Sequence, residues 1–188
     1  MRILVTGVKG QLGYDVVNEL EKRGHTAIGV DIDEMDITDA EAVDRVITEA
    51  DVEAVIHCAA YTAVDAAEDN LELCRKVNAT GTENIAKVCK KLDLKMVYIS
   101  TDYVFDGEGE RPWEPDDRRD PLNAYGIGKY EGELAMARMM TLRTSLCTSG
   151  KEKSTFLGQD VYKRQPSVPI SHFTASAPAA PSLPFVMV

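Results

Sequence analysis

Three glycines placed directly after a short apolar segment limit the fold of this chain most strongly. Gly7, Gly10 and Gly13 follow the strand-like residues 2–6 and open a segment, 11–23, whose apolar side chains recur at helical spacing. Gly7 permits a tight turn, Gly10 allows the backbone to approach a ligand, and Gly13 allows the helix to pack close to the strand. The N–H groups at the start of that helix would face phosphate. The pattern predicts a dinucleotide-binding turn, and the alternative is a compact turn without a ligand.

Strand-like and helix-like segments alternate regularly over the first 140 residues. The patterns predict strands at 2–6, 26–31, 52–58 and 95–100, helices at 11–23, 39–49, 71–92 and 123–140, and a turn-rich loop at 106–120. Asp39 is the expected N-cap of the second helix, and Asn78 marks an expected interruption of the third. Such alternation forms βαβ units with helices on both faces of a parallel sheet. We therefore expect residues 1–140 to form an α/β domain of the Rossmann type, with a doubly wound parallel sheet.

The chain changes in composition near residue 140. Of its 31 acidic and 21 basic residues, only two acidic and five basic ones lie in residues 139–188. Five of the eight prolines lie there too, in a Ser/Ala/Pro-rich stretch with neither helical nor strand periodicity. We expect residues 141–188 to be a divergent tail that is disordered or not native sequence. The stretch resembles an out-of-frame or read-through translation of a truncated gene, and a Pro-rich docking linker is the alternative.

The net charge of −10 and the sequence pI near 4.8 argue against a nucleic-acid partner, because phosphate binding requires clustered Lys and Arg. The N-terminus lacks the apolar run of a signal peptide, and no apolar run has the length of a membrane span. We therefore expect a cytoplasmic protein without a membrane partner. Cys58, Cys74, Cys89 and Cys147 form no CxxC pair and are expected to be reduced thiols, and the residues themselves predict no metal site.

An acidic residue follows the second predicted strand. Asp31 lies about 20 residues beyond the glycines, where a carboxylate accepts hydrogen bonds from the ribose hydroxyls and repels a 2′-phosphate. This position favours NADH over NADPH. Asp33 and Asp36 lie close enough to leave the assignment open, and solvation of a loop is the alternative for each of the three. Asp36 and Ile37 are also candidates to lie over the adenine.

A second group of residues combines a strand end with a helix. Ser100-Thr101-Asp102 ends the fourth predicted strand, and ligands of open parallel sheets bind beyond such strand ends. Tyr125 and Lys129 are spaced i, i+4, so they share one face of the last helix. A neighbouring ammonium lowers the pKa of a phenol below its usual value near 10. The pattern predicts proton transfer to a carbonyl oxygen while a nicotinamide cofactor transfers hydride, with a surface helix pair as the alternative.

Six longer motifs carry a family resemblance. They are GQLG at 10–13, DIT at 36–38, CAAYTAVDAAE at 58–68, VNATGTENIA at 77–86, STDYVFDG at 100–107 and PLNAYGIGKYEGE at 121–133. Through these motifs residues 1–138 resemble the extended short-chain dehydrogenase/reductase superfamily, and within it the dTDP-4-dehydrorhamnose reductase family. The sugar-nucleotide dehydratases of this superfamily have Glu after the Thr-Asp pair. This chain has Tyr103 there, which argues against a 4,6-dehydratase.

The resemblance implies reduction of dTDP-4-dehydro-6-deoxy-L-mannose (dTDP-6-deoxy-L-lyxo-4-hexulose) to dTDP-L-rhamnose by hydride transfer from NADH or NADPH. It implies a catalytic set in which Thr101 holds the C4 carbonyl, Tyr125 donates the proton and Lys129 also binds the nicotinamide ribose. Thr101 and Asp102 are the implied substrate contacts. The implied cofactor contacts, besides Tyr125, Lys129 and the three glycines, are Gln11, Leu12, Asp31, Asp36, Ile37, Ala60, Tyr61 and Thr62. Bound Mg²⁺ and homodimers also occur in the family.

The chain departs from the family pattern at several positions. Gly128 stands where the family usually has Ser or Thr, and Ala66 replaces a usual Lys; neither change removes a proposed catalytic atom. The sugar-binding half is expected to be missing, which leaves the activity of the chain open. The alternatives are another NAD-dependent sugar-nucleotide epimerase or reductase, and a non-catalytic dinucleotide-binding subunit similar to the β-subunit of methionine adenosyltransferase. Trp113 is expected to anchor its loop, with a substrate contact as the alternative.

Overall fold

A computed structural model of the protein describes residues 1–108, 112–114, 117–139, 144–148, 150–156, 159–164 and 186–187. Its elements are β1 (Arg2–Thr6), α1 (Gln11–Lys22), β2 (Thr26–Val30), α2 (Ala40–Ala50), β3 (Ala54–His57), α3 (Val64–Asp69), α4 (Leu71–Arg75), the π-helical turn η1 (Lys76–Gly81), α5 (Thr82–Lys91), β4 (Lys95–Thr101), the 3₁₀ turn η2 (Asp102–Val104), α6 (Ala124–Met139), β5 (Thr144–Thr148), β6 (Gly150–Phe156), β7 (Gln159–Arg164) and β8 (Val186–Met187). Every strand and helix predicted for residues 1–140 is present. The short elements α3 and η2 were not predicted.

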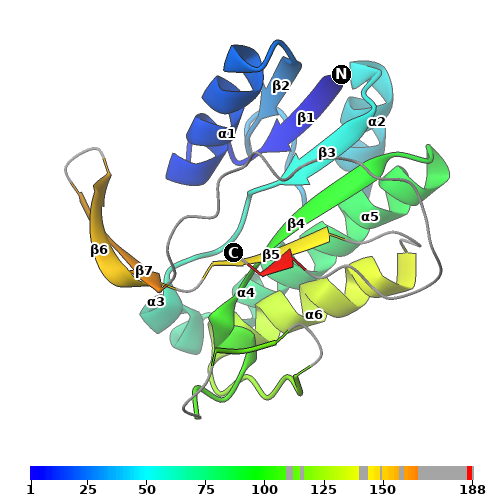
Figure 1. The fold of residues 1–188 in the computed structure, drawn as a ribbon. Helices are drawn as coiled ribbons and strands as arrows, with labels where there is room; N and C mark the ends of the chain where they lie inside the picture. Colours follow the sequence, from blue (N-terminus) through cyan, green and yellow to red (C-terminus); the bar gives the residue numbers. More distant parts are fainter. Residues whose placement is uncertain are drawn as a thin grey trace, which may run out of the picture.

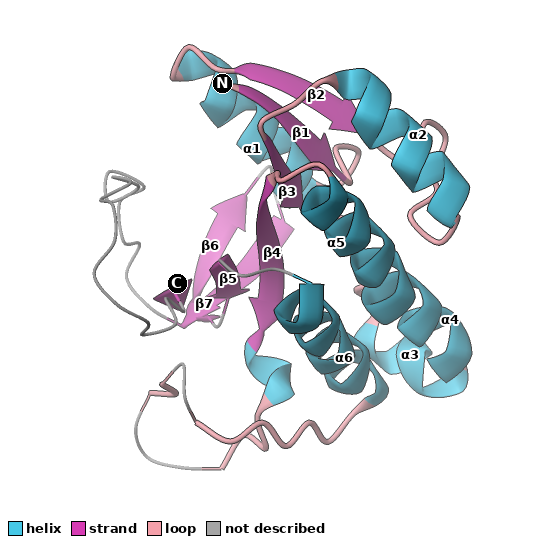
Figure 2. Ribbon diagram, turned by 90° about the vertical axis from the view of Figure 1, so that its right-hand side faces the viewer, coloured by secondary structure: helices cyan, strands magenta, loops and turns pink. Residues whose placement is uncertain are grey.

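The main sheet has the strand order β2-β1-β3-β4-β5-β8, and every neighbouring pair in it is parallel. From β1 the chain moves to one side to form β2 and then crosses to the other side to form β3. In open parallel sheets ligands bind at such a reversal, beyond the carboxyl ends of the strands. Helix α1 covers one face of the sheet, whereas α2, α5 and α6 cover the other (Figures 1 and 2). The predicted doubly wound parallel α/β fold is confirmed.

The two faces of β1 belong to different cores, because successive side chains of a strand point to opposite faces. Leu4 packs with Val55 and with residues of α2, α5 and α6 in the larger core. Ile3 and Val5 pack with Ala54 and with the apolar side of α1 in the smaller one. The apolar run of the first strand is therefore buried on both sides, as a central strand of a parallel sheet requires.

Two local predictions are confirmed. The Asp39 carboxylate caps α2, since it accepts the backbone N–H groups of Glu41 at 2.9 Å and Ala42 at 3.2 Å. The helix expected at 71–92 is divided, because the π-helical turn η1, which contains Asn78, separates α4 from α5. Such turns are frequent at functional sites, so this one marks a position to inspect.

Beyond residue 140 the described segments are strands. β5 runs parallel to β4, with Thr144 opposite Val97 and Thr148 opposite Thr101. β8 pairs with β5, whereas β6 and β7 form an antiparallel hairpin. These four short segments are paired strands, and the divergent tail over 141–188 stays a prediction. The Pro-rich stretch 165–185 lies outside the described residues, as does the side chain of Cys147.

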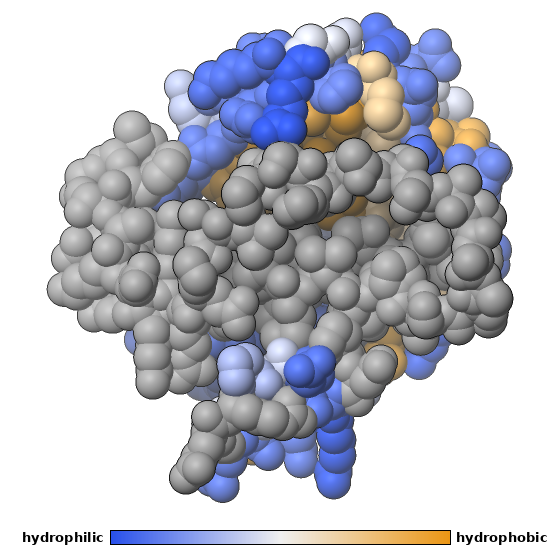
Figure 3. Space-filling view, viewed as in Figure 1, coloured by the Kyte–Doolittle hydropathy of each residue, from blue (hydrophilic) through white to orange (hydrophobic). Residues whose placement is uncertain are grey.

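Polar side chains cover much of the described surface. In the space-filling view hydrophilic residues predominate over the upper part of the molecule (Figure 3). Among the helices of the described ranges, none has the length and apolar character needed to cross a membrane.

Candidate functional site

The glycine-rich turn leaves no room for side chains. Gly7 has a φ of +70°, and a Cβ atom there would lie 2.8 Å from the Cα of Ala59. A Cβ on Gly13 would lie 2.2 Å from the carbonyl oxygen of Gly7, so the first turn of α1 packs directly on the loop. At Gly10, the N-cap of α1, a Cβ would lie 3.2 Å from the same oxygen. The turn therefore forms a bare backbone cradle at a helix N-terminus, which fits a pyrophosphate.

Two exposed residues flank this cradle. Gln11 and Leu12 begin α1, and Leu12 keeps 41% of its surface exposed although it is apolar. Across the described part of the chain, no side chain caps the start of α1. The orphan N–H groups of a helix N-terminus are therefore available to an anion here.

Asp31 ties the end of β2 to the glycine-rich turn. Its carboxylate accepts the backbone N–H of Lys9 and that of Ile32, both at 2.9 Å. Each carboxylate oxygen keeps a further lone pair for a ligand hydroxyl. The ammonium of Lys9 forms an ion pair with Asp33, which raises the pKa of Lys9. Both carboxylates therefore have partners within the loop, and the place of Asp31 against a ribose stays a prediction.

Asp36 and Ile37 make local packing contacts. One oxygen of Asp36 accepts both the N–H and the hydroxyl of Thr38, and these hydrogen bonds hold the pKa of Asp36 below its usual value. Ile37 is buried against η1, where a Cβ on Gly81 would lie 2.7 Å from its Cδ1. These hydrogen bonds and packing contacts fix both side chains. Their position over an adenine stays a prediction.

A buried network joins the ends of β1 and β3. The Thr6 hydroxyl accepts the backbone N–H groups of Cys58 at 3.1 Å and Ala59 at 3.0 Å, and it donates to Nδ1 of His57 at 2.8 Å. His57 Nε2 lies 3.1 Å from the Thr82 hydroxyl, whose proton goes to the Asn78 carbonyl oxygen at 2.7 Å. The imidazole proton must therefore reside on Nε2.

His57 is electrically neutral in this network. Burial and the positive charge of Lys129 lower the pKa of His57 to about 3. Both ring nitrogens are engaged by hydroxyl groups, so the side chain holds β1 and β3 in register with α5. Sequence reasoning gave His57 no catalytic role and did not predict the network, since its members lie up to 53 residues apart.

Asn78 holds the segment that follows β3. Its Oδ1 accepts the N–H of Tyr61 at 2.8 Å, and its Nδ2 donates to the Tyr61 carbonyl at 3.0 Å. Asn78 is 1% exposed, so these two hydrogen bonds are shielded from water. Ala60, Tyr61 and Thr62, the predicted cofactor segment, are thereby fixed next to the glycine-rich turn. From the sequence, Asn78 was expected only to interrupt the helix at 71–92, and its hydrogen bonds to Tyr61 were not predicted.

The predicted catalytic residues Tyr125 and Lys129 lie one turn apart on α6. Lys129 is 3% exposed, and its ammonium lies 4.1 Å from the centre of the Tyr98 ring. The Tyr98 hydroxyl donates to the Lys129 carbonyl at 3.1 Å, and burial raises the pKa of Tyr98. A Cβ on Gly132 would lie 2.4 Å from this hydroxyl, so α6 approaches β4 closely only because the residue is Gly.

The departure at Gly128 has a structural reason. A Cβ there would lie 3.3 Å from the Sγ of Cys74 and 3.4 Å from the Cβ of Asn78, which is a tight fit. Cys58, Cys74 and Cys89 are free thiols, as predicted, and burial raises the pKa of each of them.

The N-terminus of α6 is capped from two elements. Asn123 Oδ1 accepts the N–H of Gly126 at 2.7 Å, and Glu68 of α3 accepts the N–H of Ala124 at 2.8 Å. A Cβ on Gly126 would lie 2.2 Å from the carbonyl oxygen of Tyr103. These contacts place the first turn of α6 against η2.

Tyr125 is thereby placed near the predicted cofactor segment and near the end of β4. Its ring lies edge-on to that of Tyr103, with the centroids 5.8 Å apart. Tyr61 of the cofactor segment packs against the same small apolar cluster as Tyr125. The structure therefore brings the end of β3, the end of β4 and the start of α6 together.

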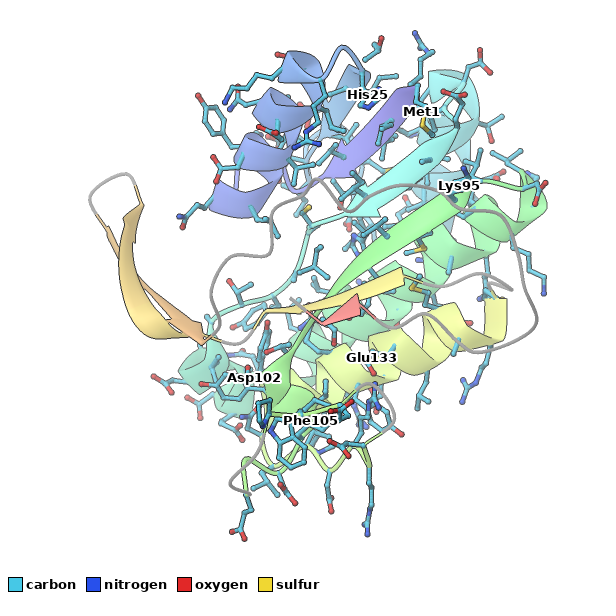
Figure 4. The ribbon with its side chains drawn as sticks, viewed as in Figure 1. Met1, His25, Lys95, Asp102, Phe105 and Glu133 are labelled. Atoms are coloured by element: carbon cyan, nitrogen blue, oxygen red, sulfur yellow. The ribbon has the colours of Figure 1, made fainter. Side chains whose placement is uncertain are left out.

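Thr101, which is 5% exposed, ends β4. The hydroxyl donates to Asp102 Oδ1 and accepts the N–H of Tyr103, both at 3.3 Å. Asp102 and Phe105 lie at the lower end of β4 in Figure 4, whereas Met1, His25 and Lys95 mark the opposite ends of the strands. Thr101 therefore lies at the carboxyl edge of the sheet, as do Gly7 and Asp31.

Trp113 stacks on Phe105, with the ring centroids 4.6 Å apart and the planes 2° from parallel. This contact agrees with the expected role as a loop anchor. Within the described ranges, no three His, Cys, Asp or Glu side chains are grouped so as to hold a metal ion. Bound Mg²⁺ stays a prediction of the family resemblance.

Comparison with known proteins identifies a matching family and several relatives. The sequence profile described as the RmlD substrate binding domain matches residues 1–172. A protein of Mycolicibacterium smegmatis named dTDP-4-dehydrorhamnose reductase is 40% identical over 161 residues, which are 83% of this chain and 49% of that protein.

Solved structures give the same picture. The crystal structure of a dTDP-4-dehydrorhamnose reductase from Clostridium acetobutylicum superposes with a TM-score of 0.77 at 38% identity, covering 79% of this chain and 53% of that one. The Bacillus anthracis enzyme of the same name, in complex with NADP, gives 0.76 at 36% identity, covering 78% and 52%. The chain thus spans about half the length of these relatives.

Proposed function

Because the chain belongs to the family described as the RmlD substrate binding domain, we propose that it forms the cofactor-binding and catalytic part of a dTDP-4-dehydrorhamnose reductase. The substrate would be dTDP-4-dehydro-6-deoxy-L-mannose and the product dTDP-L-rhamnose. One observation carries the proposal: Lys129, which is 3% exposed, lies one turn from Tyr125 on a helix packed against the strand that ends in Thr101. A surface helix pair would not bury its ammonium in this way.

The residues of the carboxyl edge fit a nicotinamide dinucleotide. The glycine cradle excludes side chains, so the backbone of Gly7, Gly10 and Gly13, with Gln11 and Leu12, would hold the pyrophosphate. Asp31 would accept the ribose hydroxyls, and the segment Ala60, Tyr61 and Thr62 would line the nicotinamide end, with Asp36 and Ile37 on the adenine side. When bound, the reduced cofactor supplies the hydride that is added to the carbonyl carbon.

The chain's own residues would bind and protonate the carbonyl oxygen of the substrate. The Thr101 hydroxyl would turn from Asp102 to donate to the C4 carbonyl, and Asp102 would contact the sugar. Tyr125 would then give its phenolic proton to the same oxygen as charge develops there. Lys129, one turn away, favours the phenolate that remains, because an adjacent positive charge stabilises it. His57 takes no part in proton transfer, since it is neutral and its ring nitrogens are engaged.

We further propose that the domain boundary lies at residue 140. Residues 1–140 would bind the cofactor and carry the catalytic side chains, and residues 141–188 would be the divergent tail. A homodimer would belong to the longer enzymes of the family.

Isothermal titration of the 188-residue chain with NADH and NADPH tests the proposal first. Saturable binding of either cofactor is the expected result, and an assay of NADH oxidation with the keto sugar then tests turnover. Absence of binding for both cofactors contradicts the proposal. Binding without turnover fits a chain that lacks the sugar-binding half, and it equally fits a dinucleotide-binding role without catalysis.

The preference for NADH over NADPH is the finer part of the proposal. Asp31 is fixed by the N–H groups of Lys9 and Ile32, so its charge stays where a 2′-phosphate would lie. Removing that repulsion in Asp31→Asn is worth about 1 kcal/mol, so we expect NADPH to bind about fivefold more tightly. Asp44→Asn on α2, where Asp44 pairs with Lys91, is the matched control. Unchanged NADPH affinity in Asp31→Asn would exclude a role for this carboxylate in cofactor choice.

A further inference from the structure

Glu133 is a buried carboxylate that the proposed reaction does not use. It lies on α6 one turn beyond Lys129, and its side chain is 9% exposed. Its Oε1 accepts the Ser100 hydroxyl at 2.5 Å, and its Oε2 lies 3.3 Å from Nε of Arg119. A charge buried to this degree requires partners, and these two come from β4 and from the loop that follows η2.

Arg119 continues the contact into a column of aromatic rings. Its side chain is 13% exposed, and its guanidinium carbon lies 5.2 Å from the centre of the Phe105 ring. Phe105 in turn stacks on Trp113. Arg119 also donates from Nη1 to the Asp117 carbonyl at 2.8 Å, so the guanidinium fixes its own loop as well as the helix.

The column ends beside the predicted substrate residues. Ser100 directly precedes Thr101, so Glu133 connects the end of β4 with the helix that carries Lys129. The N–H of Asp120 donates to the Val104 carbonyl at 2.9 Å, which returns the loop to η2. In Figure 4 the labelled side chains of Glu133, Phe105 and Asp102 lie in the same lower part of the molecule, near the end of β4.

We propose that Glu133 and Arg119 are positioning residues whose buried ion pair clamps the loop carrying Trp113 against the catalytic edge. The described part of the loop that contains Trp113 and Arg119 then forms one side of the space next to Thr101 in which the sugar nucleotide binds, and this location of the substrate rests on the proposed function. The clamp itself depends only on the contacts of Arg119 with Glu133 and Phe105 and on the stacking of Trp113 on Phe105. In Arg119→Met the Glu133 carboxylate would keep the Ser100 hydroxyl but lose the Arg119 guanidinium, so the loop would move away from α6 to let water reach the carboxylate.

Fluorescence tests the clamp directly, because Trp113 is the only tryptophan in the chain. In Arg119→Met we expect the emission to shift to longer wavelength and acrylamide quenching to rise towards that of the chain in denaturant. Arg119→Lys keeps the charge and should restore part of the original emission. Arg118→Met is the matched control, because Arg118 pairs with Asp120 and its side chain is 86% exposed. Emission of Arg119→Met identical to the original, or an equal shift in Arg118→Met, would overturn the proposal.

A second readout separates positioning from stability. Energy transfer from Trp113 to bound NADH, measured at saturation, is expected to fall in Arg119→Met and in Glu133→Gln while the calorimetric affinity for NADH is unchanged. Far-UV circular dichroism checks that each variant is folded, and Glu133→Gln, which keeps an acceptor for Ser100, tests the clamp if Arg119→Met does not fold. Unchanged transfer in both folded variants refutes the clamp. If the original chain does not bind NADH, the proposed function fails, whereas the emission of the free chain still tests the clamp.

Discussion

Replacing Asn78 by Ala should both destabilise the fold and weaken cofactor binding. Asn78 is 1% exposed and makes two hydrogen bonds to the backbone of Tyr61, of 2.8 and 3.0 Å. Each hydrogen bond contributes about 1 kcal/mol, and the half-buried N–H and carbonyl left behind add part of a desolvation penalty, so the loss is about 2–3 kcal/mol. The segment Ala60 to Thr62 would then lose its attachment to η1.

Urea unfolding and calorimetry measure the two effects. With a denaturant slope of about 2 kcal/mol per M, the midpoint of Asn78→Ala should fall by about 1–1.5 M. Affinity for NADH, measured well below the midpoint, should fall as well, because the free chain must pay to order the segment before it binds. Asn18→Ala is the control: Asn18 donates to the Tyr14 carbonyl within α1, and its loss should be within about 0.5 kcal/mol.

A midpoint for Asn78→Ala equal to that of Asn18→Ala would show that the two hydrogen bonds to Tyr61 do not stabilise the fold. Normal NADH affinity in a destabilised Asn78→Ala would refute the second part of the reasoning, since the segment would then not contact the cofactor.

Two further substitutions test the turn and the network. In Gly13→Ala the new Cβ would lie 2.2 Å from the Gly7 carbonyl oxygen, so the cradle must open; we expect NADH affinity to fall by about tenfold or more, about 1.4 kcal/mol, and normal affinity in calorimetry would contradict the assignment. His57 has a pKa of about 3 when folded against 6.5 when unfolded, so the unfolded chain binds the extra proton in this window. Stability should therefore decrease as the pH falls from 6.5 towards 3, by up to about 1.4 kcal/mol per pH unit from this group. Urea unfolding at several pH values should give a shallower slope for His57→Gln, and an equal slope would show that His57 does not stay neutral.

The parts of the site that were predictable depend on local sequence. The glycine spacing predicts a turn whose atoms all come from residues 7–13. Tyr125 and Lys129, spaced i, i+4, share one face of a helix by helix geometry alone. Strand ends are also local, so Asp31 and Thr101 were assigned to one edge once the sheet was taken as parallel.

The missed parts depend on contacts between distant residues. Ser100 and Glu133 are 33 residues apart, and His57 and Thr82 are 25 apart, so no window of sequence contains either pair. From the sequence alone, a Glu in a helix and a Ser in a strand could each point to solvent. Only the packing of α6 on β4 shows that these two side chains face each other. Ile37 illustrates the converse case, because a motif suggested an adenine contact and the structure adds a packing contact with Gly81.

Helix α6 shows why packing, rather than helix propensity, sets the geometry of the predicted catalytic residues. Gly126, Gly128 and Gly132 each weaken an isolated helix by about 1 kcal/mol relative to Ala. A Cβ on Gly126 would clash with the Tyr103 carbonyl and one on Gly132 with the Tyr98 hydroxyl, whereas a Cβ on Gly128 would fit tightly against Cys74. A helix with this composition is held in place by its contacts with η2, α4 and β4, and it moves if any of them moves. The spacing between Tyr125, Lys129 and the end of β4 is therefore a property of the assembled core.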